Sequence, residues 1–244
     1  MNKPQRVTLF MQCIVDSCFP QVGEAMVAVL ERQGLTLEYP ANQTCCGQPA
    51  FNAGYRNEAA RLARRFLDVF EDAECIVCPS GSCVHMVRHH YRELFAREPR
   101  LLARAERVGA KTFEFTEFLF DVLGVTDLGA SWPGDVTYHD SCHLLRGLGV
   151  KDQPRALLAG VRGLNLIEMT RSDECCGFGG TFSAKYPEIS EALLETKLAN
   201  IQATGAGAVV GCDMGCLMHM QGMIRRRELP ISVHHIAEIL AGRK

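Results

Sequence analysis

The chain has 244 residues, of which 47% are hydrophobic and 22% charged, and its formal net charge at pH 7 is -2. Such a length fits one large domain or two of about 120 residues each, and the composition is typical of a folded protein rather than of a disordered or membrane chain. The nearly balanced charge argues against a nucleic-acid-binding protein. The amino terminus lacks the apolar core of a secretory signal, and no apolar run is long enough to cross a bilayer. We therefore expect a cytoplasmic protein that is not an integral membrane protein.

The first half of the chain alternates between predicted strands and helices. Residues 6–11 (RVTLFM) and 35–39 (LTLEY) read as strands, and a third strand is expected at 75–78 (CIVC). Between the last two, apolar residues recur at the spacing of one helical face, which predicts an amphipathic helix. That face consists of Ala59, Leu62, Ala63, Phe66, Leu67 and Phe70.

The second half repeats the first at an offset of about 130 residues. DVTYHDSC (135–142) matches RVTLFMQC (6–13), LNLIEMTRSDECCGF (164–178) matches LTLEYPANQTCCGQ (35–48), and the segment ending in MGC (214–216) matches the one ending in GSC (81–83). The helix expected at 187–202 should bury a face formed by Ile189, Ala192, Leu193 and Thr196. A Gly- and Pro-rich stretch, GASWPGD (129–135), predicts the boundary between the copies.

This pattern predicts an α/β fold of two tandem, similar units with mostly parallel sheets, related by internal duplication. The first cysteine-rich unit should span residues 1–130, and the second should span residues 131–244.

Twelve cysteines are a high number for a chain expected in a reducing compartment, where structural disulfides are disfavoured. Several of them follow predicted strands, and the carboxyl ends of parallel strands meet at one edge of a sheet. Adjacent cysteines can face one centre only from an irregular turn, for which Gly47 and Gly177 supply the conformational freedom. We therefore expect four thiols to converge in each unit: Cys13, Cys45, Cys46 and Cys83 in the first, and Cys142, Cys175, Cys176 and Cys216 in the second.

Four thiolates suit an iron–sulfur cluster or zinc, and a metal-free thiol relay is a third interpretation. Scattered single cysteines and an adjacent pair favour a cluster, because zinc sites usually take their cysteines as two close pairs. Helices beginning just after Cys83 and Cys216 would favour the thiolate forms.

The residues outside this pattern have simpler interpretations. The cysteines without a cysteine partner in the other copy are expected to be small buried side chains: Cys18, Cys75, Cys78 and Cys212. Ser80 and Asp213 are predicted helix caps. His139 and His143 flank Cys142, where they could hydrogen-bond a sulfur or replace a ligand, and for these we expect packing or support of a sulfur ligand.

At CIVDSCFPQVGEA (13–25), CCGQPAFNAGY (45–55), CPSGSC (78–83), HDSCHLLRGLG (139–149) and DMGCLMH (213–219), the chain resembles the cysteine-rich CCG family, and within it the lactate utilization members. The family includes the cysteine-rich component of heterodisulfide reductase and the glycolate oxidase iron–sulfur subunit. The resemblance covers nearly the whole chain. One departure is that Ser80 and Asp213 stand where that reductase has cysteines, which argues against its non-cubane cluster and its disulfide-cleaving chemistry.

The resemblance implies two iron–sulfur sites in an electron-transfer subunit of a complex that oxidises L-lactate, a 2-hydroxy acid, to pyruvate. The four thiols that remain in each copy leave an ordinary [4Fe-4S] cluster possible at each site, so up to two such clusters are expected. It also implies partner subunits: a ferredoxin-type subunit similar to lactate utilization protein B, and one similar to protein C. Two alternatives stay open from the sequence. One is a scaffold with structural zinc, and the other is a thiol–disulfide oxidoreductase.

Overall fold

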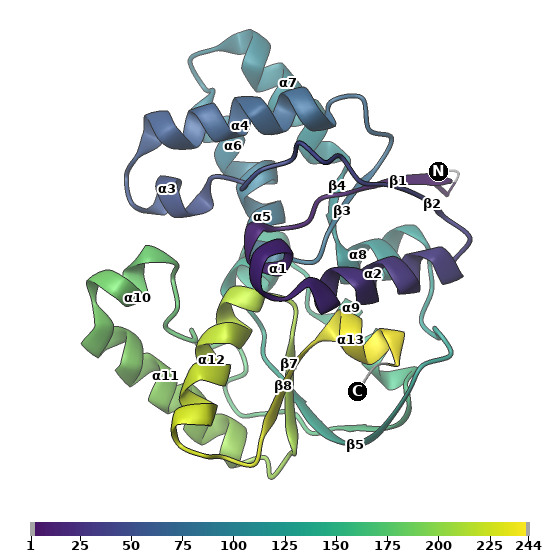
Figure 1. The fold of residues 1–244 in the computed structure, drawn as a ribbon, viewed down its shortest axis with the longest axis vertical. Helices are drawn as coiled ribbons and strands as arrows, with labels where there is room; N and C mark the ends of the chain where they lie inside the picture. Colours follow the sequence, from purple (N-terminus) through teal and green to yellow (C-terminus); the bar gives the residue numbers. More distant parts are fainter. Residues whose placement is uncertain (1–2, 243–244) are drawn as a thin grey trace. The chain divides into compact units, whose positions relative to one another are not determined.

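The computed structural model describes residues 3–242 and divides the chain into two compact units. Unit 1 comprises Met1–Leu123 and unit 2 comprises Gly124–Lys244. Each unit has its own sheet and its own core, and we describe them one at a time (Figure 1).

Unit 1 contains a parallel sheet with helices in the connections. Its strands are β1 (Arg6–Leu9), β2 (Thr36–Glu38), β3 (Ile76–Cys78) and β4 (Thr112–Glu114). Its α-helices are α1 (Cys13–Cys18), α2 (Pro20–Arg32), α3 (Gln48–Asn52), α4 (Arg56–Phe70), α5 (Gly81–His85), α6 (Tyr91–Leu94), α7 (Pro99–Ala110) and α8 (Phe115–Glu117). Two π-helical turns, η1 (Met86–His90) and η2 (Phe118–Val122), complete the unit.

The strands of unit 1 are ordered β2-β1-β3-β4, and every neighbouring pair is parallel. In Figure 1, α4 and α7 lie on one side of this sheet, and α2 and α8 lie on the other. The core under α4 is aromatic: the Phe10 ring packs 4.8 Å from Phe66 and 5.5 Å from Phe70, measured between ring centroids. The chain leaves β1 toward β2 and later returns to β3 on the other side of β1. Loops at such a point of reversal diverge and leave room for a ligand.

Unit 2 repeats this plan. Its strands are β5 (Ser131–Tyr138), β6 (Arg162–Leu166), β7 (Ala208–Gly211) and β8 (Ser232–His235). Its helices are the π-helical turn η3 (His143–Gly147) and the α-helices α9 (Asp152–Ala159), α10 (Thr181–Lys185), α11 (Pro187–Gln202), α12 (Met214–Arg226) and α13 (Ile236–Ala241).

The strand order in unit 2 is β6-β5-β7-β8, again parallel throughout, so the two sheets share one topology. The predicted fold class, two similar α/β units with parallel sheets, is confirmed. In Figure 1, α12 lies on one side of β7 and β8, and α13 lies on the other.

The two helices that follow the cysteine pairs differ in which face is buried. In α4 the predicted face is correct, since Ala59, Ala63, Phe66, Leu67 and Phe70 are buried. In α11 the predicted face is wrong: Ile189 is 55% exposed and Leu193 is 37% exposed. The face that is buried instead consists of Ser190, Leu194, Lys197, Leu198 and Ile201.

Two polar side chains explain this difference, because both lie on the buried face of α11 and both find hydrogen-bond partners there. The Lys197 ammonium donates to the carbonyl oxygens of Arg171 (3.1 Å) and Ser172 (3.0 Å). The Ser190 hydroxyl donates to the carbonyl oxygen of Gly177 (2.8 Å). A pattern based on apolar residues alone therefore selects the wrong side of the helix.

None of the helices within residues 3–242 combines the length and the apolar character that a membrane crossing requires.

Candidate metal centre

The four predicted thiols of unit 1 follow three different strands. Cys13 begins α1 after β1, Cys45 and Cys46 lie in the loop after β2, and Cys83 lies in the first turn of α5 after β3. The sulfur atoms of Cys46 and Cys83 are 3.4 Å apart. Cys45 interacts with both Cys13 and Cys46, so the four thiols form a continuous chain of contacts in the order Cys13, Cys45, Cys46, Cys83. We call this set quartet 1.

The backbone around quartet 1 is held by hydrogen bonds between its loops. Gly47 adopts a left-handed conformation with a φ of 90°, and its N–H donates to the Cys45 sulfur (3.4 Å). The Tyr91 hydroxyl donates to the carbonyl oxygen of Cys46 (2.9 Å), and the Gln12 side chain donates to the carbonyl oxygen of Pro79 (3.2 Å). These bonds join the cysteine turn after β2 to α6, and the loop after β1 to the loop after β3.

Unit 2 brings its thiols together in the same order: Cys142, Cys175, Cys176 and Cys216, which we call quartet 2. Cys142 directly precedes η3, and Cys216 lies in the first turn of α12. Gly177 has a φ of 86°, and its N–H donates to the Cys175 sulfur (3.3 Å), as the N–H of Gly47 does to Cys45 in unit 1.

The thiols of quartet 1 have strongly divergent proton affinities. Hydrogen bonding to Cys13 and then to Cys46 lowers the pKa of Cys45 to about 3, and the Gly47 N–H adds to this effect. Hydrogen bonding to Cys45 raises the pKa of Cys13, although Cys13 is itself exposed. Cys46, which is only 2% exposed, has its pKa raised by Cys45, by Cys83 and by burial. One thiolate is thus stabilised by neighbouring thiols that keep their protons.

Quartet 2 shows the same division. Hydrogen bonding to Cys142 and to Cys176 lowers the pKa of Cys175 to about 2, whereas Cys142 and Cys176 have raised pKa values because of their contacts with neighbouring thiols. The Cys176 thiol and the nearby His139 ring lower the pKa of Cys216 to about 6, against the effect of burial. Thiolates are the metal-binding form of cysteine, and each quartet contains at least one thiol whose pKa is lowered into that form.

The remaining cysteines only partly match their prediction. Cys75, Cys78 and Cys212 are buried as predicted, with exposures of 3%, 0% and 0%. Cys18 is exposed, so that prediction is wrong: Cys18 ends the short helix α1, of whose residues only Val15 is buried.

Of the two predicted helix caps, Ser80 is confirmed and Asp213 is wrong. The Ser80 hydroxyl accepts from the N–H of Cys83 (3.3 Å) and caps α5. The Asp213 side chain makes no cap hydrogen bond, because its carboxylate accepts from the Ser141 hydroxyl (2.7 Å) and links the loops after β5 and β7. Both helices begin two residues before their cysteine rather than after it, so Cys83 and Cys216 lie inside the first turn.

The two histidines that flank Cys142 occupy different environments. The Nδ1 atom of His143 lies 3.6 Å from the Cys142 sulfur. His139 is 1% exposed, and one of its ring nitrogens lies within 4.8 Å of the sulfurs of both Cys176 and Cys216. The sequence places His139 beside Cys142, but its closeness to Cys176 and Cys216 depends on strand pairing that no local pattern shows.

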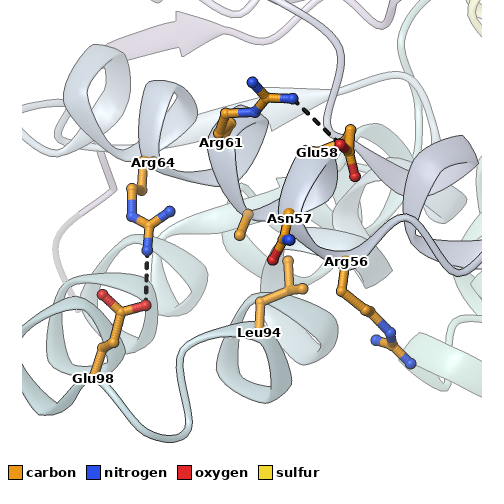
Figure 2. A pocket seen from close by; sticks show the side chains of 8 residues that line it. Arg56, Asn57, Glu58, Arg61, Arg64, Leu94 and Glu98 are labelled. Carbon is orange, nitrogen blue, oxygen red and sulfur yellow. Dashed lines mark hydrogen bonds and ion pairs between the residues drawn. The ribbon is translucent and has the colours of Figure 1, made fainter.

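Figure 2 shows a surface pocket in unit 1 that has a different character. It lies along the exposed side of α4. Four of its charged side chains form pairs with one another, and Arg56 pairs with Glu93 outside the lining. Arg64 lies 2.7 Å from Glu98, and Arg61 lies 3.4 Å from Glu58. The lining contains no cysteine: it consists of Arg56, Asn57, Glu58, Ala60, Arg61, Arg64, Leu94 and Glu98. The quartets, and not this pocket, are therefore the candidate site.

Comparison with known proteins identifies the family of the chain. Residues 7–88 and 136–221 each match the model of the cysteine-rich domain family CCG, and the two matches contain both quartets. Curated relatives cover almost the whole chain. Lactate utilization protein A of Bacillus pumilus (strain SAFR-032) is 46% identical over 98% of this chain and 100% of its own length. The protein of the same name from Bacillus cereus (strain B4264) is 48% identical over 98% of this chain and 99% of its own length.

The chain belongs to the CCG family, in the group of the lactate utilization A proteins. The resemblance predicted from the sequence is confirmed. Among solved structures, a hypothetical protein from Helicobacter pylori matches with a TM-score of 0.65 and 11% sequence identity. The match covers 100% of this chain and 50% of that one, so the chain spans half the length of that protein, and the likeness concerns the fold alone.

Proposed function

We propose that this chain is a cytoplasmic iron–sulfur electron-transfer subunit of a complex that oxidises L-lactate to pyruvate. Quartet 1 would hold one [4Fe-4S] cluster, and quartet 2 would hold the other. The observation that carries the proposal is the convergence, in each unit, of four thiols from three separate loops in one order of contacts.

The donor atoms fit such a cluster. Every side chain of the two quartets offers sulfur, the usual ligand of iron–sulfur clusters. Backbone N–H groups of Gly47 and Gly177 point at Cys45 and Cys175, and hydrogen bonds of this kind tune cluster potentials. The left-handed glycines also keep side-chain bulk away from the cysteine turn. The chemistry that a bound cluster supplies is the transfer of single electrons.

The substrate and the partners in this proposal follow from the relatives, which are named lactate utilization protein A. Oxidation of lactate to pyruvate releases two electrons and two protons, so the complex needs electron carriers in addition to a site that binds the acid. We assign the carrier role to this chain, and we expect partner subunits similar to the lactate utilization proteins B, of ferredoxin type, and C.

The direct test is the content of iron, zinc and acid-labile sulfide in protein purified without oxygen. We expect iron and sulfide in equal amounts, and a visible absorption that bleaches on reduction. Cys46→Ala and Cys176→Ala should each remove about half of both elements, whereas Cys75→Ala, a buried cysteine outside the quartets, should remove neither. Zinc without sulfide would support the structural scaffold instead. A metal-free protein with disulfide reductase activity would support the thiol–disulfide oxidoreductase.

The substrate is tested separately by growth. A strain that lacks this chain should fail to grow on L-lactate as sole carbon source while it still grows on glycolate. Complementation with Cys75→Ala should restore growth, and complementation with Cys46→Ala should not. Normal growth of the deletion strain on L-lactate would contradict the assignment to lactate oxidation.

A further inference from the structure

Unit 1 and unit 2 differ at one position next to their quartets. The repeat aligns Phe10, which follows β1, with His139, which follows β5. In unit 1 the Phe10 ring packs against Phe66 and Phe70 in an aromatic core. In unit 2 a polar ring occupies the equivalent buried position, and the neighbouring helix carries Lys197 where unit 1 has Phe66. Beside its thiols, unit 2 thus has nitrogen-bearing side chains at two positions where unit 1 has aromatic rings.

The His139 ring is buried, and its interaction with the Cys216 thiol lowers the pKa of that thiol, but no described atom meets the geometry of a hydrogen bond to the ring. The backbone N–H of His139 donates to the carbonyl oxygen of Val210 (2.8 Å), which fixes the residue at the carboxyl end of β5, an inner strand. Within the part of the chain that the structure describes, neither ring nitrogen has a hydrogen-bond partner. A buried polar group left in that state costs about 1–3 kcal/mol. The phenyl ring of unit 1 avoids this cost, so the imidazole needs another explanation.

The neighbouring carboxylates do not explain the buried imidazole, because both accept hydrogen bonds from other side chains. The two oxygens of Asp140 accept from the Arg155 guanidinium (2.9 and 2.8 Å), and one of them also accepts from the Ser172 hydroxyl (2.7 Å). Asp213 accepts from Ser141. The ring of His139 instead faces the thiols: one nitrogen and the sulfurs of Cys176 and Cys216 all lie within 4.8 Å of one another.

We propose that His139 is a direct nitrogen ligand of the metal centre in unit 2. Its ring joins Cys176 and Cys216, and the remaining sulfur of the set comes from Cys142 or Cys175. Unit 1 has no counterpart, since Phe10 offers no donor atom, and its centre is held by thiolates alone. The inference rests on the proposed function to the extent that quartet 2 binds a metal centre.

The consequence is that the two centres are not equivalent. A neutral imidazole in place of a thiolate makes a centre less negative, and histidine ligation accompanies higher reduction potentials in iron–sulfur proteins. We therefore expect the centre of unit 2 to have the higher reduction potential, so that at equilibrium an electron resides there in preference to unit 1.

The test uses full-length chain that carries ¹⁵N-labelled histidine, loaded without oxygen, reduced and measured by pulsed electron paramagnetic resonance. We expect a strong ¹⁵N coupling that is lost in His139→Ala and retained in His143→Ala, the matched control beside Cys142. His139→Cys, which supplies sulfur at the same position, should also lose the coupling and should lower the potential of one centre only. If the His139→Ala variant does not take up the metal centre of unit 2, the loss or retention of the ¹⁵N coupling in His139→Cys decides whether His139 is a ligand.

A spectrum from a fully loaded chain without a strongly coupled histidine nitrogen would overturn the proposal, and so would a coupling that persists in His139→Ala. A weak coupling, as expected for a ring N–H hydrogen-bonded to sulfur, would also count against ligation. These results differ from a failure of the proposed function, which would show as iron and sulfide missing from both units. If the chain holds zinc, X-ray absorption at the zinc edge should show nitrogen scattering that disappears in His139→Ala.

Discussion

Gly177 lies directly against Ser190. A Cβ atom at Gly177 would stand 2.4 Å from the backbone oxygen of Ser190, and the Ser190 hydroxyl closes the contact by donating to the Gly177 carbonyl oxygen (2.8 Å). This contact fixes the cysteine turn of unit 2 on α11. The equivalent position in unit 1, Gly47, is looser, because a Cβ atom there would stand 3.4 Å from the backbone oxygen of Ala59.

Gly177→Ala is therefore expected to be more harmful than Gly47→Ala. Both glycines have a left-handed φ, near 86° and 90°, so each substitution carries a backbone strain of about 1–2 kcal/mol. At Gly177 the new methyl group also meets backbone that cannot move without displacing α11, and we expect a further loss of about 1–3 kcal/mol. Urea unfolding of both variants measures the difference. Equal destabilisation by the two substitutions would contradict the close packing of Gly177.

Much of this architecture follows from the sequence. The duplication, the parallel sheets and the convergence of the cysteine loops are all predictable, because strand pattern and repeat offset place the loops at one edge. The buried face of α11 is not predictable in this way, since Lys197 and Ser190 are buried by hydrogen bonds to carbonyl groups of a distant loop. The environment of His139 escapes prediction for a similar reason: its partners belong to loops far along the chain.

Lys197→Met should destabilise unit 2. The substitution keeps the length of the side chain, but it removes the donor to the carbonyl oxygens of Arg171 and Ser172, which precede the cysteine pair. Both carbonyl oxygens keep a backbone donor, the N–H of Glu174 for Arg171 and the N–H of Asp140 for Ser172. We therefore expect the loss of the hydrogen bonds from the charged ammonium to cost about 1.5–3 kcal/mol. Lys185→Met, at an exposed position of the same unit, is the control and should change stability by less than about 0.5 kcal/mol. Thermal unfolding distinguishes the two variants. A Lys197→Met variant as stable as the wild type would show that water replaces the ammonium as the hydrogen-bond donor.

Arg155→Met should have the largest effect among the ion pairs. Its guanidinium binds both oxygens of Asp140, a residue that is 2% exposed, and it also contacts Glu168 (2.6 Å). Removing one partner of a buried pair typically costs about 3–5 kcal/mol, because the other charge is left buried. The control is Arg61→Met, whose pairing with Glu58 is exposed, so about 0–1 kcal/mol is expected.

Arg155→Met should also reduce metal binding at quartet 2. Asp140 accepts from the hydroxyl of Ser172, which lies three residues before Cys175. Without the Arg155 guanidinium, Asp140 is held less firmly, and so is the cysteine loop that is hydrogen-bonded to it. We expect Arg155→Met to lower the iron content of the chain by up to half, and the double variant Asp140→Asn with Arg155→Met to recover part of both stability and iron. A double variant that is less stable than Arg155→Met would contradict the explanation by a stranded charge.

Glu114 should make the stability of unit 1 depend on pH. It joins the end of β4 to α8, where one carboxyl oxygen caps the helix by accepting from the N–H groups of Thr116 and Glu117, and the other oxygen is buried without a hydrogen bond among the described residues. Burial raises the pKa of Glu114 from 4.5 to about 8, although these hydrogen bonds act in the opposite direction. The folded protein therefore retains a proton that the unfolded chain releases.

The sign of the effect follows from this retained proton. Between pH 4.5 and about 8 the folded state binds more protons than the unfolded state, so the free energy of unfolding falls as the pH rises through this range. Glu114→Gln keeps a neutral side chain of the same shape, and it should flatten this fall while leaving stability near pH 5 almost unchanged. Urea unfolding at half-unit steps from pH 5 to 8.5 measures the slope, with the exposed Glu58→Gln as control. Parallel curves for the wild type and Glu114→Gln would show that Glu114 ionises alike in the folded and unfolded chain.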